Sequence, residues 1–489
     1  MVSKRILPPV LKKAKLYFVG IKGTGMSALA ELMQRHGAKV SGSDTDERFY
    51  TDAILTSLGI PYYEGFHGEQ VPDDADLVVY SAAYDPDVHP EILEARRRGI
   101  PIAEYTLALG ELSRNLHATG IAGVHGKTTT AAMAGTIVKE LELPAGVLVG
   151  SAVRGFDDRA TYFGGDRYFI AETCEYRRHF LSFHPNQLVI TTVDVDHLDY
   201  YRDYADIESA FLEYADRLPK GGILIYCADD AGARGCALKL AERRPDLVLR
   251  PYGFEATGDF QIVDYRSKPG VHTYRLAGWQ TEFKLMVPGV HSVLDAAAAA
   301  AAVYGILVES GGQLDQAAKV GEHEMAGVAA ALETFRGSKR RSEILGERRG
   351  VLFADDYGHH PNEIKTTLAG FRRFYPGRRM IVDFMSHTYT RTQALLDEFA
   401  VAFADADIVI LHKIYASARE KAGCVDGRTL FEKVKQRHSH VLYYHEVDDA
   451  EADVMDLLQT GDLFITLGAG DNWRLGAELY EKIESEKKR

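Results

Sequence analysis

The sequence predicts an α/β fold in three domains, each built on a mostly parallel sheet. The chain has 489 residues, and at about 150 residues per domain this length predicts about three domains. Apolar runs of strand length alternate with helical patterns in three successive regions, as in doubly wound parallel sheets. In each of the first two regions a glycine-rich turn links an apolar run to a helical pattern.

The first region opens with a short apolar strand and a glycine turn. Its predicted elements are the strand Leu16–Val19, the helix Met26–Gly37 and the strands Lys39–Asp44, Leu77–Tyr80 and Ile100–Ile102. The polar stretch Ser113–His117 follows these elements and marks the end of the first domain.

The second and third regions repeat this alternation. Predicted strands of the second region are Tyr168–Ile170, Leu188–Ile190 and Ile223–Tyr226. The seven alanines Ala296–Ala302 favour a helix. Between Met325 and Arg336 the pattern passes into the third region, whose predicted strands are Val351–Ala354, Met380–Val382, Ile408–Ile410 and Leu463–Ile465.

Composition and charge exclude several classes of protein. The formal net charge of −13 disfavours non-specific binding to nucleic acid or anionic lipid. The four cysteines, Cys174, Cys227, Cys236 and Cys424, form no C-x-x-C pair, which argues against a disulfide framework and a structural zinc site. No secretion signal or apolar span of about 20 residues is evident. We therefore expect a cytoplasmic protein.

The segment Gly123–Thr130, with sequence GVHGKTTT, predicts a nucleotide-phosphate site. Backbone N–H groups of a glycine turn that opens a helix cradle phosphate oxygens. Lys127 would reach the terminal phosphates, and the hydroxyl of Thr128 or Thr129 would coordinate Mg²⁺. The general motif has a glycine where this chain has Ile121, so the match is to a shortened form. A turn that merely caps a helix is the alternative.

Acidic residues and a histidine follow two predicted strands of the second region. Glu172 and Glu175 come after one strand, and Asp194, Asp196 and His197 come after the next. Loops at the carboxyl ends of parallel strands line the ligand crevice. Carboxylate and imidazole groups at these positions are candidate metal ligands for phosphoryl transfer.

A second glycine turn, Gly20–Gly25, lies between a strand and a helix, and Asp44 ends the next strand. The arrangement is similar to a dinucleotide fingerprint, but the spacing is G-x-x-G-x-G rather than G-x-G-x-x-G. A nucleotide or phosphosugar site and a turn needed only for packing both remain open.

Eight motifs occur in order along nearly the whole chain. They are GIKGTGMSALAEL, GVHGKTTT, AETCE, DVDHLDYY, PGVHSVLDAAAA, DDYGHHPNEI, SHTYTRT and LGAGDN. Together they resemble the Mur ligases of peptidoglycan synthesis. The resemblance implies a UDP-sugar-binding Rossmann-like domain over residues 1–116, a central P-loop ATPase-like domain over 117–330, and a C-terminal amino-acid-binding Rossmann-like domain over 331–489.

The resemblance also implies a reaction. ATP would phosphorylate the carboxylate of UDP-N-acetylmuramate, and the amino group of L-alanine would displace the phosphate. ATP and Mg²⁺ are the implied cofactors, and the chain would be a monomer or a homodimer. No nucleic-acid or membrane partner is expected.

By position, the resemblance assigns roles to individual residues. The residues that would contact the UDP part of the sugar nucleotide are Gly23, Thr24, Gly25, Met26, Ser27, Asp44 and Ser81. It assigns ATP to Gly123, His125, Gly126, Lys127, Thr128 and Thr129, its adenine side to His291 and Asp295, and its ribose to Asp356. Mg²⁺ would be held by Thr128, Glu172 and His197, with Glu172 as a shared ligand or base. The amino acid would meet Tyr357, His359, His387 and Arg391, whose guanidinium can bind a carboxylate bidentately.

The chain departs from the family pattern at several positions. The usual H-N-x-x-N reads His291-Ser292-Val293-Leu294-Asp295, whose serine and aspartate can still hydrogen-bond an adenine amino group. The usual T-N reads Thr191-Thr192, and a usual arginine is Thr388. Many related ligases carry a modified lysine shortly after the D-H pair. In this chain the stretch Leu198–Pro219 contains no lysine, as expected for alanine addition.

Other interpretations of the same motifs remain open. A ligase that attaches a preformed murein peptide to the same sugar nucleotide would share them. An NAD-dependent oxidoreductase would use the first glycine turn, and a nucleotide-gated binding protein would use the phosphate loop without synthesis. At single positions, His359–Pro361 could form a turn, His387 could be a satisfied core histidine, and Gly468–Asp471 could be a packing turn.

Overall fold

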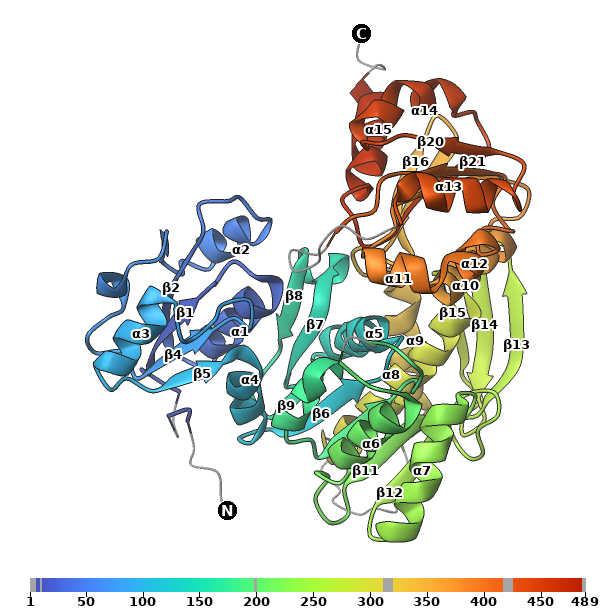
Figure 1. Cartoon of the computed structure of the whole chain (residues 1–489). Coiled ribbons are helices and arrows are strands. Elements are labelled where there is room, and N and C mark those ends of the chain that lie inside the picture. Colours follow the sequence, from blue (N-terminus) through green and yellow to red (C-terminus); the bar gives the residue numbers. More distant parts are fainter. Residues whose placement is uncertain (1–5, 9–10, 198–199, 311–319, 417–424, 486–489) are drawn as a thin grey trace. The chain divides into compact units, whose positions relative to one another are not determined.

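The computed structural model describes residues 6–8, 11–197, 200–310, 320–416 and 425–485 (Figure 1). By its internal contacts the chain divides into two compact units. The first unit comprises the chain up to Asp264 with Tyr274–Phe283 and Leu294–Thr334. The second unit comprises Tyr265–Thr273, Lys284–Val293 and the chain from Phe335 onward.

The first unit begins with a five-stranded sheet in the order β3-β2-β1-β4-β5, in which all neighbours are parallel. Its strands are β1 (Lys15–Val19), β2 (Lys39–Asp44), β3 (Tyr62–Glu64), β4 (Leu77–Tyr80) and β5 (Ile102–Glu104). Its helices are α1 (Thr24–Arg35), α2 (Thr51–Ser57), α3 (Pro90–Arg97) and α4 (Tyr105–Ser113), with the 3₁₀ turn η1 (Gly68–Gln70). The strand order reverses between β1 and β4, where open α/β sheets bind ligands.

The same unit contains a seven-stranded sheet in the order β12-β11-β10-β6-β9-β7-β8. Its strands are β6 (His117–Ala122), β7 (Ala145–Val153), β8 (Arg159–Phe163), β9 (Tyr168–Glu172), β10 (Gln187–Ile190), β11 (Ile223–Cys227) and β12 (Val248–Tyr252). Its helical segments are α5 (Lys127–Glu140), α6 (Tyr204–Ala215), α7 (Ala231–Arg243), α8 (Val290–Ser310), α9 (Glu322–Thr334), η2 (Arg154–Phe156) and η3 (Tyr176–Ser182). Only β7 and β8 pair antiparallel.

The order of this sheet decides where the phosphate loop lies. β6 lies between β10 and β9, with Ala122 level with Ile190 and Ile121 level with Glu172. The loop that leaves β6 therefore starts beside the carboxyl ends of both strands. The polar residues that follow β9 and β10 are thereby brought to one edge of the sheet.

The second unit is built on a six-stranded sheet in the order β16-β17-β21-β18-β19-β20. Its strands are β16 (Glu343–Arg348), β17 (Val351–Asp356), β18 (Arg379–Phe384), β19 (Ile408–Leu411), β20 (Val441–Tyr443) and β21 (Asp462–Leu467). Its helical segments are α10 (Pro361–Phe374), α11 (Tyr389–Ala394), α12 (Leu396–Ala400), α13 (Gly427–Lys435), α14 (Glu451–Leu457), α15 (Trp473–Ser485) and η4 (Asp448–Ala450). Only β16 pairs antiparallel. A separate three-stranded sheet contains β13 (Ile262–Lys268), β14 (Val271–Leu276) and β15 (Glu282–Leu285).

The helix α8 carries the alanine run. By length and composition, its segment Val290–Val308 could cross a membrane. The sequence had been expected to contain no apolar span of this length. In the structure 72% of this segment is buried, and Ala296–Ala302 are at most 1% exposed. Burial in a protein core accounts for the apolar composition of this helix.

Most predicted strands have the predicted positions, but the last strand of the first sheet does not. β5 begins at Ile102 rather than at Ile100. The backbone N–H of Ile100 donates to Ala95 O and so belongs to the end of α3.

Among the cysteines, Cys174, Cys227 and Cys236 are free thiols, and Cys424 lies outside the described residues.

Candidate active site

The phosphate loop joins β6 to α5 through two glycines in left-handed conformations. Gly126 is the N-cap of α5 with φ +83°, and Gly123 has φ +143°. A Cβ on Gly123 would lie 1.9 Å from Thr191 Oγ1, and one on Gly126 would lie 2.6 Å from Asp295 Oδ1. Both positions therefore require glycine, for their backbone angles and for the close approach of neighbouring side chains.

The pair Thr191-Thr192 shapes this loop from the end of β10. Val124 N donates to Thr192 O at 3.0 Å, and His125 N donates to Thr192 Oγ1 at 2.8 Å. Thr191 Oγ1 donates to His125 O at 2.5 Å. The second threonine, which stands where the family usually has asparagine, thus supplies a side-chain acceptor for the loop. Its neighbour's hydroxyl supplies a donor.

Replacing Gly123 by alanine is expected to raise the KM for ATP by about tenfold or more. The new methyl group would displace Thr191 and disturb the backbone N–H groups that surround a bound phosphate. The matched control is Gly155→Ala, because a Cβ there meets nothing within 4 Å. Equal ATP KM values for the two variants, measured by phosphate release, would contradict the assigned loop geometry.

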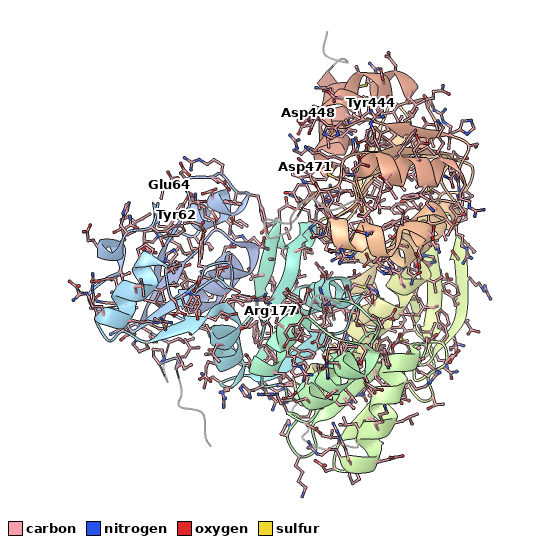
Figure 2. All side chains as sticks on the ribbon, in the orientation of Figure 1. Tyr62, Glu64, Arg177, Tyr444, Asp448 and Asp471 are labelled. Carbon is pink, nitrogen blue, oxygen red and sulfur yellow. The ribbon has the colours of Figure 1, made fainter. Side chains whose placement is uncertain are left out.

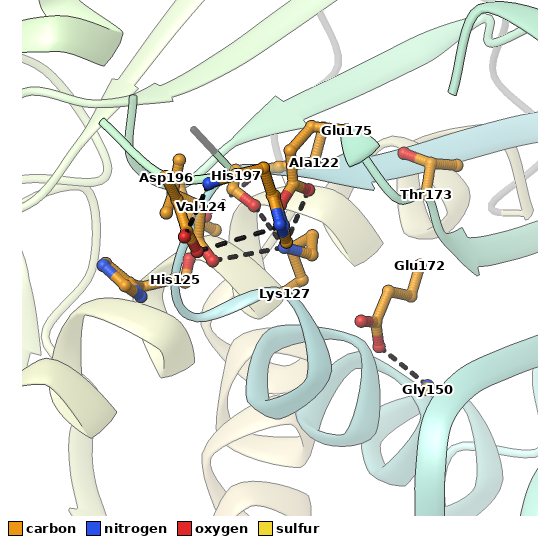
Figure 3. Close-up of polar contacts among 12 residues, drawn as sticks. Ala122, Val124, His125, Lys127, Gly150, Glu172, Thr173, Glu175, Asp196 and His197 are labelled. Carbon is orange, nitrogen blue, oxygen red and sulfur yellow. Dashed lines mark hydrogen bonds and ion pairs between the residues drawn. The ribbon is translucent and has the colours of Figure 1, made fainter. Parts of the chain in front are cut away.

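Lys127, the first residue of α5, folds back onto the loop (Figure 3). Its Nζ donates to Gly123 O at 2.5 Å and to Val124 O at 3.2 Å, and lies 2.9 Å from Glu175 Oε2. Burial lowers the pKa of Lys127, but Glu175, Cys174 and Glu172 together raise it above its ordinary value. The side chain therefore carries a positive charge at the opening of the loop.

Glu175 contacts both Lys127 and His197 (Figure 3). Besides its ion pair with Lys127, it lies 3.4 Å from His197 Nε2. Burial raises the pKa of Glu175, but Lys127 and His197 bring it well below the ordinary value. Burial lowers the pKa of His197, whereas Glu175 and then Asp196 raise it above the usual range. The sequence marked Glu175 as a possible metal ligand; the structure pairs it with Lys127 and His197.

Glu172, at the end of β9, faces a different group of atoms. Its Oε1 accepts from Thr128 Oγ1 at 3.0 Å. Its Oε2 accepts from Gly150 N at 2.7 Å, the contact drawn in Figure 3. Gly150 belongs to β7 and was not predicted as part of the site. Thr129, next along α5, is half-buried. The structure thus brings the predicted Thr128 and Glu172 together.

The Thr128–Glu172 pair fits a magnesium ion. Mg²⁺ is usually held by one or two carboxylates together with waters and substrate phosphates rather than by a protein cage. Accordingly, the described residues include no group of three or more His, Cys, Asp or Glu side chains able to hold a metal. His197 could contribute only as a neutral imidazole, and its contact with Glu175 favours the charged form.

The first glycine turn is fastened by Asp44. The Asp44 carboxylate accepts from Lys22 N at 2.6 Å and from Thr45 N at 2.8 Å. The buried Lys22 ammonium donates to Thr45 O and lies 3.2 Å from Asp52. Asp44 and Lys22 therefore shape this turn from within. Any contact of Asp44 with UDP would add to bonds that the carboxylate already makes.

The predicted UDP-side residues lie at the start of α1 and after β4. Thr24 Oγ1 accepts from the Tyr50 hydroxyl at 3.0 Å, and Ser27 Oγ donates to Thr24 O at 3.1 Å. Met26 is buried, and Gly23 and Gly25 flank Thr24 at the helix start. Ser81 N donates to Val19 O at 3.1 Å, which places it beside the end of β1. Helix N-termini of this kind suit phosphate groups.

The two predicted adenine-side residues occur at the start of α8. Asp295 accepts from Thr130 Oγ1 at 3.2 Å, so it packs against the helix of the phosphate loop. Ser292 Oγ donates to Pro288 O at 2.8 Å and thus supports the turn that opens α8. His291, assigned to the second unit, lowers the pKa of His272, on which burial has the larger effect.

In the second unit, Asp356 ends β17 and holds the turn that follows it. Its Oδ2 accepts from Ser342 N at 2.6 Å and its Oδ1 accepts from Gly358 N at 2.7 Å. Burial raises the pKa of the neighbouring Asp355 to about 6, although Arg340 lowers it. Asp356 therefore orders the loop on which Tyr357 lies, and any ribose contact would add to these bonds.

The predicted amino-acid residues cluster after β17 and β18. The His359 ring lies 5.3 Å from that of Tyr357 and 6.0 Å from that of His387. Burial lowers the pKa of His359 to about 4, so its imidazole is neutral at pH 7. His360 is the N-cap of α10, so the histidine pair lies at the turn that opens this helix, as one of the two open interpretations had it. Arg391 lies in α11, four residues after His387.

Three parts of the chain match descriptions of one family. Residues 15–117 match "Mur ligase family, catalytic domain", residues 121–303 match "Mur ligase middle domain", and residues 340–470 match "Mur ligase, glutamate ligase domain". The three matches follow the order of the sheets along the chain.

Full-length relatives and solved structures agree with these matches. The UDP-N-acetylmuramate–L-alanine ligase of Treponema pallidum (strain Nichols) is 50% identical over 486 residues, 99% of this chain and 100% of the relative. The enzyme of that name from Borreliella burgdorferi is 40% identical over 94% of this chain and 97% of its own. The structure of UDP-N-acetylmuramate-alanine ligase from Thermotoga maritima has a TM-score of 0.75 at 26% identity, covering 96% of this chain and 99% of that one. The chain belongs to the Mur ligase family.

Proposed function

We propose that this chain is a cytoplasmic, ATP-dependent ligase that joins L-alanine to the carboxylate of UDP-N-acetylmuramate in peptidoglycan synthesis. The observation that carries the proposal is 50% identity over nearly the whole chain to an enzyme of that name. The phosphate loop supports it, because Lys127 pairs with Glu175 and Thr128 bonds Glu172 at one edge of a mostly parallel sheet. The domain boundaries 1–116, 117–330 and 331–489 and a monomeric or homodimeric state remain predictions.

The reaction needs two bond exchanges. A carboxylate oxygen of UDP-N-acetylmuramate attacks the γ-phosphorus of ATP, which forms an acyl phosphate and releases ADP. The amine of L-alanine, after losing one proton, attacks the acyl carbon through a tetrahedral intermediate. The nitrogen loses its second proton as the C–O bond to phosphate breaks, which leaves an amide and inorganic phosphate. Activation is required because a free carboxylate has no leaving group that an amine can displace.

The phosphate loop would hold the nucleotide during the first exchange. The Lys127 ammonium would bond phosphate oxygens in place of Glu175 and the loop carbonyls. Gly123 and Gly126 would let the backbone N–H groups approach the phosphate closely. Mg²⁺, when bound by Thr128 and Glu172, would neutralise charge on the transferring phosphoryl group. Glu175 would keep His197 in place as the charge of Lys127 turns toward phosphate. Positioning and preorganised charge supply most of the rate in such reactions.

The remaining predicted residues would bind the rest of the substrates. Gly23, Thr24, Gly25, Met26, Ser27, Asp44 and Ser81 would surround the UDP part, with His291, Asp295 and Asp356 on the nucleoside of ATP. Tyr357, His359, His387 and Arg391 would receive L-alanine, with Arg391 on its carboxylate. A neutral His359 suits this role, since its ring can accept a hydrogen bond from the substrate near pH 7.

Phosphate release from ATP is expected only when UDP-N-acetylmuramate and an amino acid are both present. A coupled assay should compare L-alanine, glycine, L-serine and a murein tripeptide at equal concentration. Preference for L-alanine supports the proposal, and preference for the tripeptide would indicate a recycling ligase instead. ATP turnover at the same rate without the sugar nucleotide would reject both, and nicotinamide-dependent oxidation of a substrate would restore the oxidoreductase interpretation.

A further inference from the structure

A charged network is buried beneath the carboxyl ends of three strands in the second unit. Asp383 lies in β18, His412 follows β19 directly, and Asn472 follows β21. His412 Nε2 lies 2.7 Å from Asp383 Oδ2, and Asn472 Nδ2 donates to Asp383 Oδ1 at 2.7 Å. The side chains of Asp383 and His412 are 0% exposed, and Asn472 is likewise 0% exposed. We call these three residues the strand-end clamp.

The strand-end clamp reaches further backbone segments. Asn472 Nδ2 also contacts Asp383 O at 3.0 Å and Leu467 O at 3.2 Å. His412 Nδ1 lies 3.2 Å from Tyr444 O. Tyr444 and Asp471 both occur in the second unit (Figure 2). The network therefore ties together the ends of β18, β19 and β21 and the residue that follows β20.

Both ring nitrogens of His412 face acceptors, Nε2 at Asp383 Oδ2 and Nδ1 at Tyr444 O, a geometry that favours an imidazolium paired with the carboxylate. Burial lowers the pKa of His412, but Asp383, Tyr444 O and Asp471 raise it above the ordinary value. Removing two charges from water is costly, and apolar side chains of similar volume are often as stable or more stable there. Folding stability alone gives little reason for a charged pair at this place. The hydrogen bonds of the pair are directional, so they fix the strand ends relative to one another.

The segment directly after β18 is strained. Thr388 has φ +68° and ψ +136°, a conformation that is costly for a β-branched residue. Its N–H donates to Tyr415 O at 3.0 Å, and Tyr415 N donates to Ser386 O at 2.8 Å. Strained backbone persists only where its surroundings hold it. Here the surroundings are the segment after β19, which begins at His412.

The turn after β21 packs against the same segment. A Cβ on Gly468 would lie 2.3 Å from Met385 O, and one on Gly470 would lie 2.3 Å from Met385 Sδ. Gly468–Asp471 is thus a packing turn, the alternative that the sequence left open. Asn472 fixes the far end of this turn. Both segments that support residues 385–392 are therefore anchored by the clamp.

We propose that Asp383, His412 and Asn472 are positioning residues for the amino-acid substrate. By fixing the strand ends they hold residues 385–392 in the strained conformation that presents His387 and Arg391. The clamp touches no substrate itself. This role rests on the proposed function, in which His387 and Arg391 receive L-alanine.

The test variant is Asp383→Val/His412→Leu, which removes both charges at once. A single substitution would leave the partner charged and buried without its counter-ion, which would strongly destabilise the fold. The control is Arg379→Met/Asp462→Asn. That ion pair, at 2.7 Å, joins β18 and β21 at their opposite ends. The clamp variant thus removes an ion pair at the carboxyl ends of the strands, and the control variant removes one at their amino ends.

Two measurements separate this role from a general effect on folding. We expect the KM for L-alanine to rise about tenfold in the clamp variant, while its KM for ATP changes less than about twofold. In the free protein, hydrogen exchange at the amides of Thr388 and Tyr415 should become about tenfold faster. The control variant should show neither change. Unchanged alanine KM and unchanged exchange in a folded clamp variant would overturn the proposal.

The exchange measurement also separates this proposal from the proposed function. If the wild-type enzyme shows no alanine-dependent turnover, the proposed function fails. Exchange at Thr388 and Tyr415 still decides whether the clamp holds the segment. If exchange accelerates but the alanine KM does not change, the clamp holds the segment without positioning the substrate, and the proposal fails.

Discussion

Replacing Lys127 by methionine is expected to lower kcat by roughly 10²–10³ or more, the range observed when one preorganised transition-state donor is removed. Methionine keeps most of the side-chain volume but removes the charge that would face the β- and γ-phosphates. Phosphate release with saturating UDP-N-acetylmuramate and L-alanine measures the effect. The loss should appear in kcat as well as in the KM for ATP, because charge on the phosphoryl group changes during transfer.

Loss of Lys127 also leaves the buried Glu175 with His197 as its remaining close partner. The double variant Lys127→Met/Glu175→Gln removes that unpaired charge, so its thermal midpoint should recover while its activity stays low. Lys139→Met is the matched control in the same helix, since the Lys139 ammonium donates to Gly155 O, away from the phosphate loop. Near wild-type kcat in the double variant would remove Lys127 from the mechanism.

Most of the strands that were predicted are largely buried, although β2, β5 and β11 are only partly so. All four residues of β10 and all six of β21 are buried, and such strands read as continuous apolar runs. The missed strands include β3, β8, β13, β16 and β20, each of which is short or exposes polar residues along its length. β7 was also missed, although most of its residues are buried. Their positions depend on pairing with partners elsewhere in the chain, which a local pattern does not record.

The phosphate loop could be predicted because its requirements are local. Glycines, a lysine and a hydroxyl within eight residues determine how a phosphate is held. The division of labour between Glu172 and Glu175 could not be predicted in this way. These residues are three positions apart, yet Glu172 accepts from Thr128 and Gly150, whereas Glu175 pairs with Lys127 and His197. Only the fold shows which group each carboxylate faces.

Polar contacts between residues far apart in the sequence are even harder to predict from a motif. Asp295 was assigned to adenine by position, but its carboxylate bonds Thr130, 165 residues earlier in the chain. Asp383, His412 and Asn472 belong to three segments that are adjacent only because β18 lies between β19 and β21. The sequence contains each of these residues without any spacing that links them. Sheet order, rather than spacing, creates these polar networks.

Replacing Glu172 by glutamine is expected to lower kcat by roughly 10²–10³ while leaving the fold intact. Glutamine has the same shape and an oxygen that can accept from Gly150 N, as Glu172 Oε2 does at 2.7 Å. It lacks the negative charge that a divalent cation beside Thr128 requires. The Mg²⁺ concentration for half-maximal rate should therefore rise, and Mg²⁺-dependent binding of ADP, measured by calorimetry without turnover, should weaken.

Glu140→Gln is the control for this change, because Glu140 is exposed at the opposite end of α5. That variant should keep the wild-type rate and Mg²⁺ dependence. If Glu172→Gln lowered kcat without altering Mg²⁺ dependence or ADP binding, Glu172 would act as a base rather than as a metal ligand. Wild-type values for all three quantities would instead mean that the carboxylate only braces Thr128 against β7, and the ion would need another protein ligand.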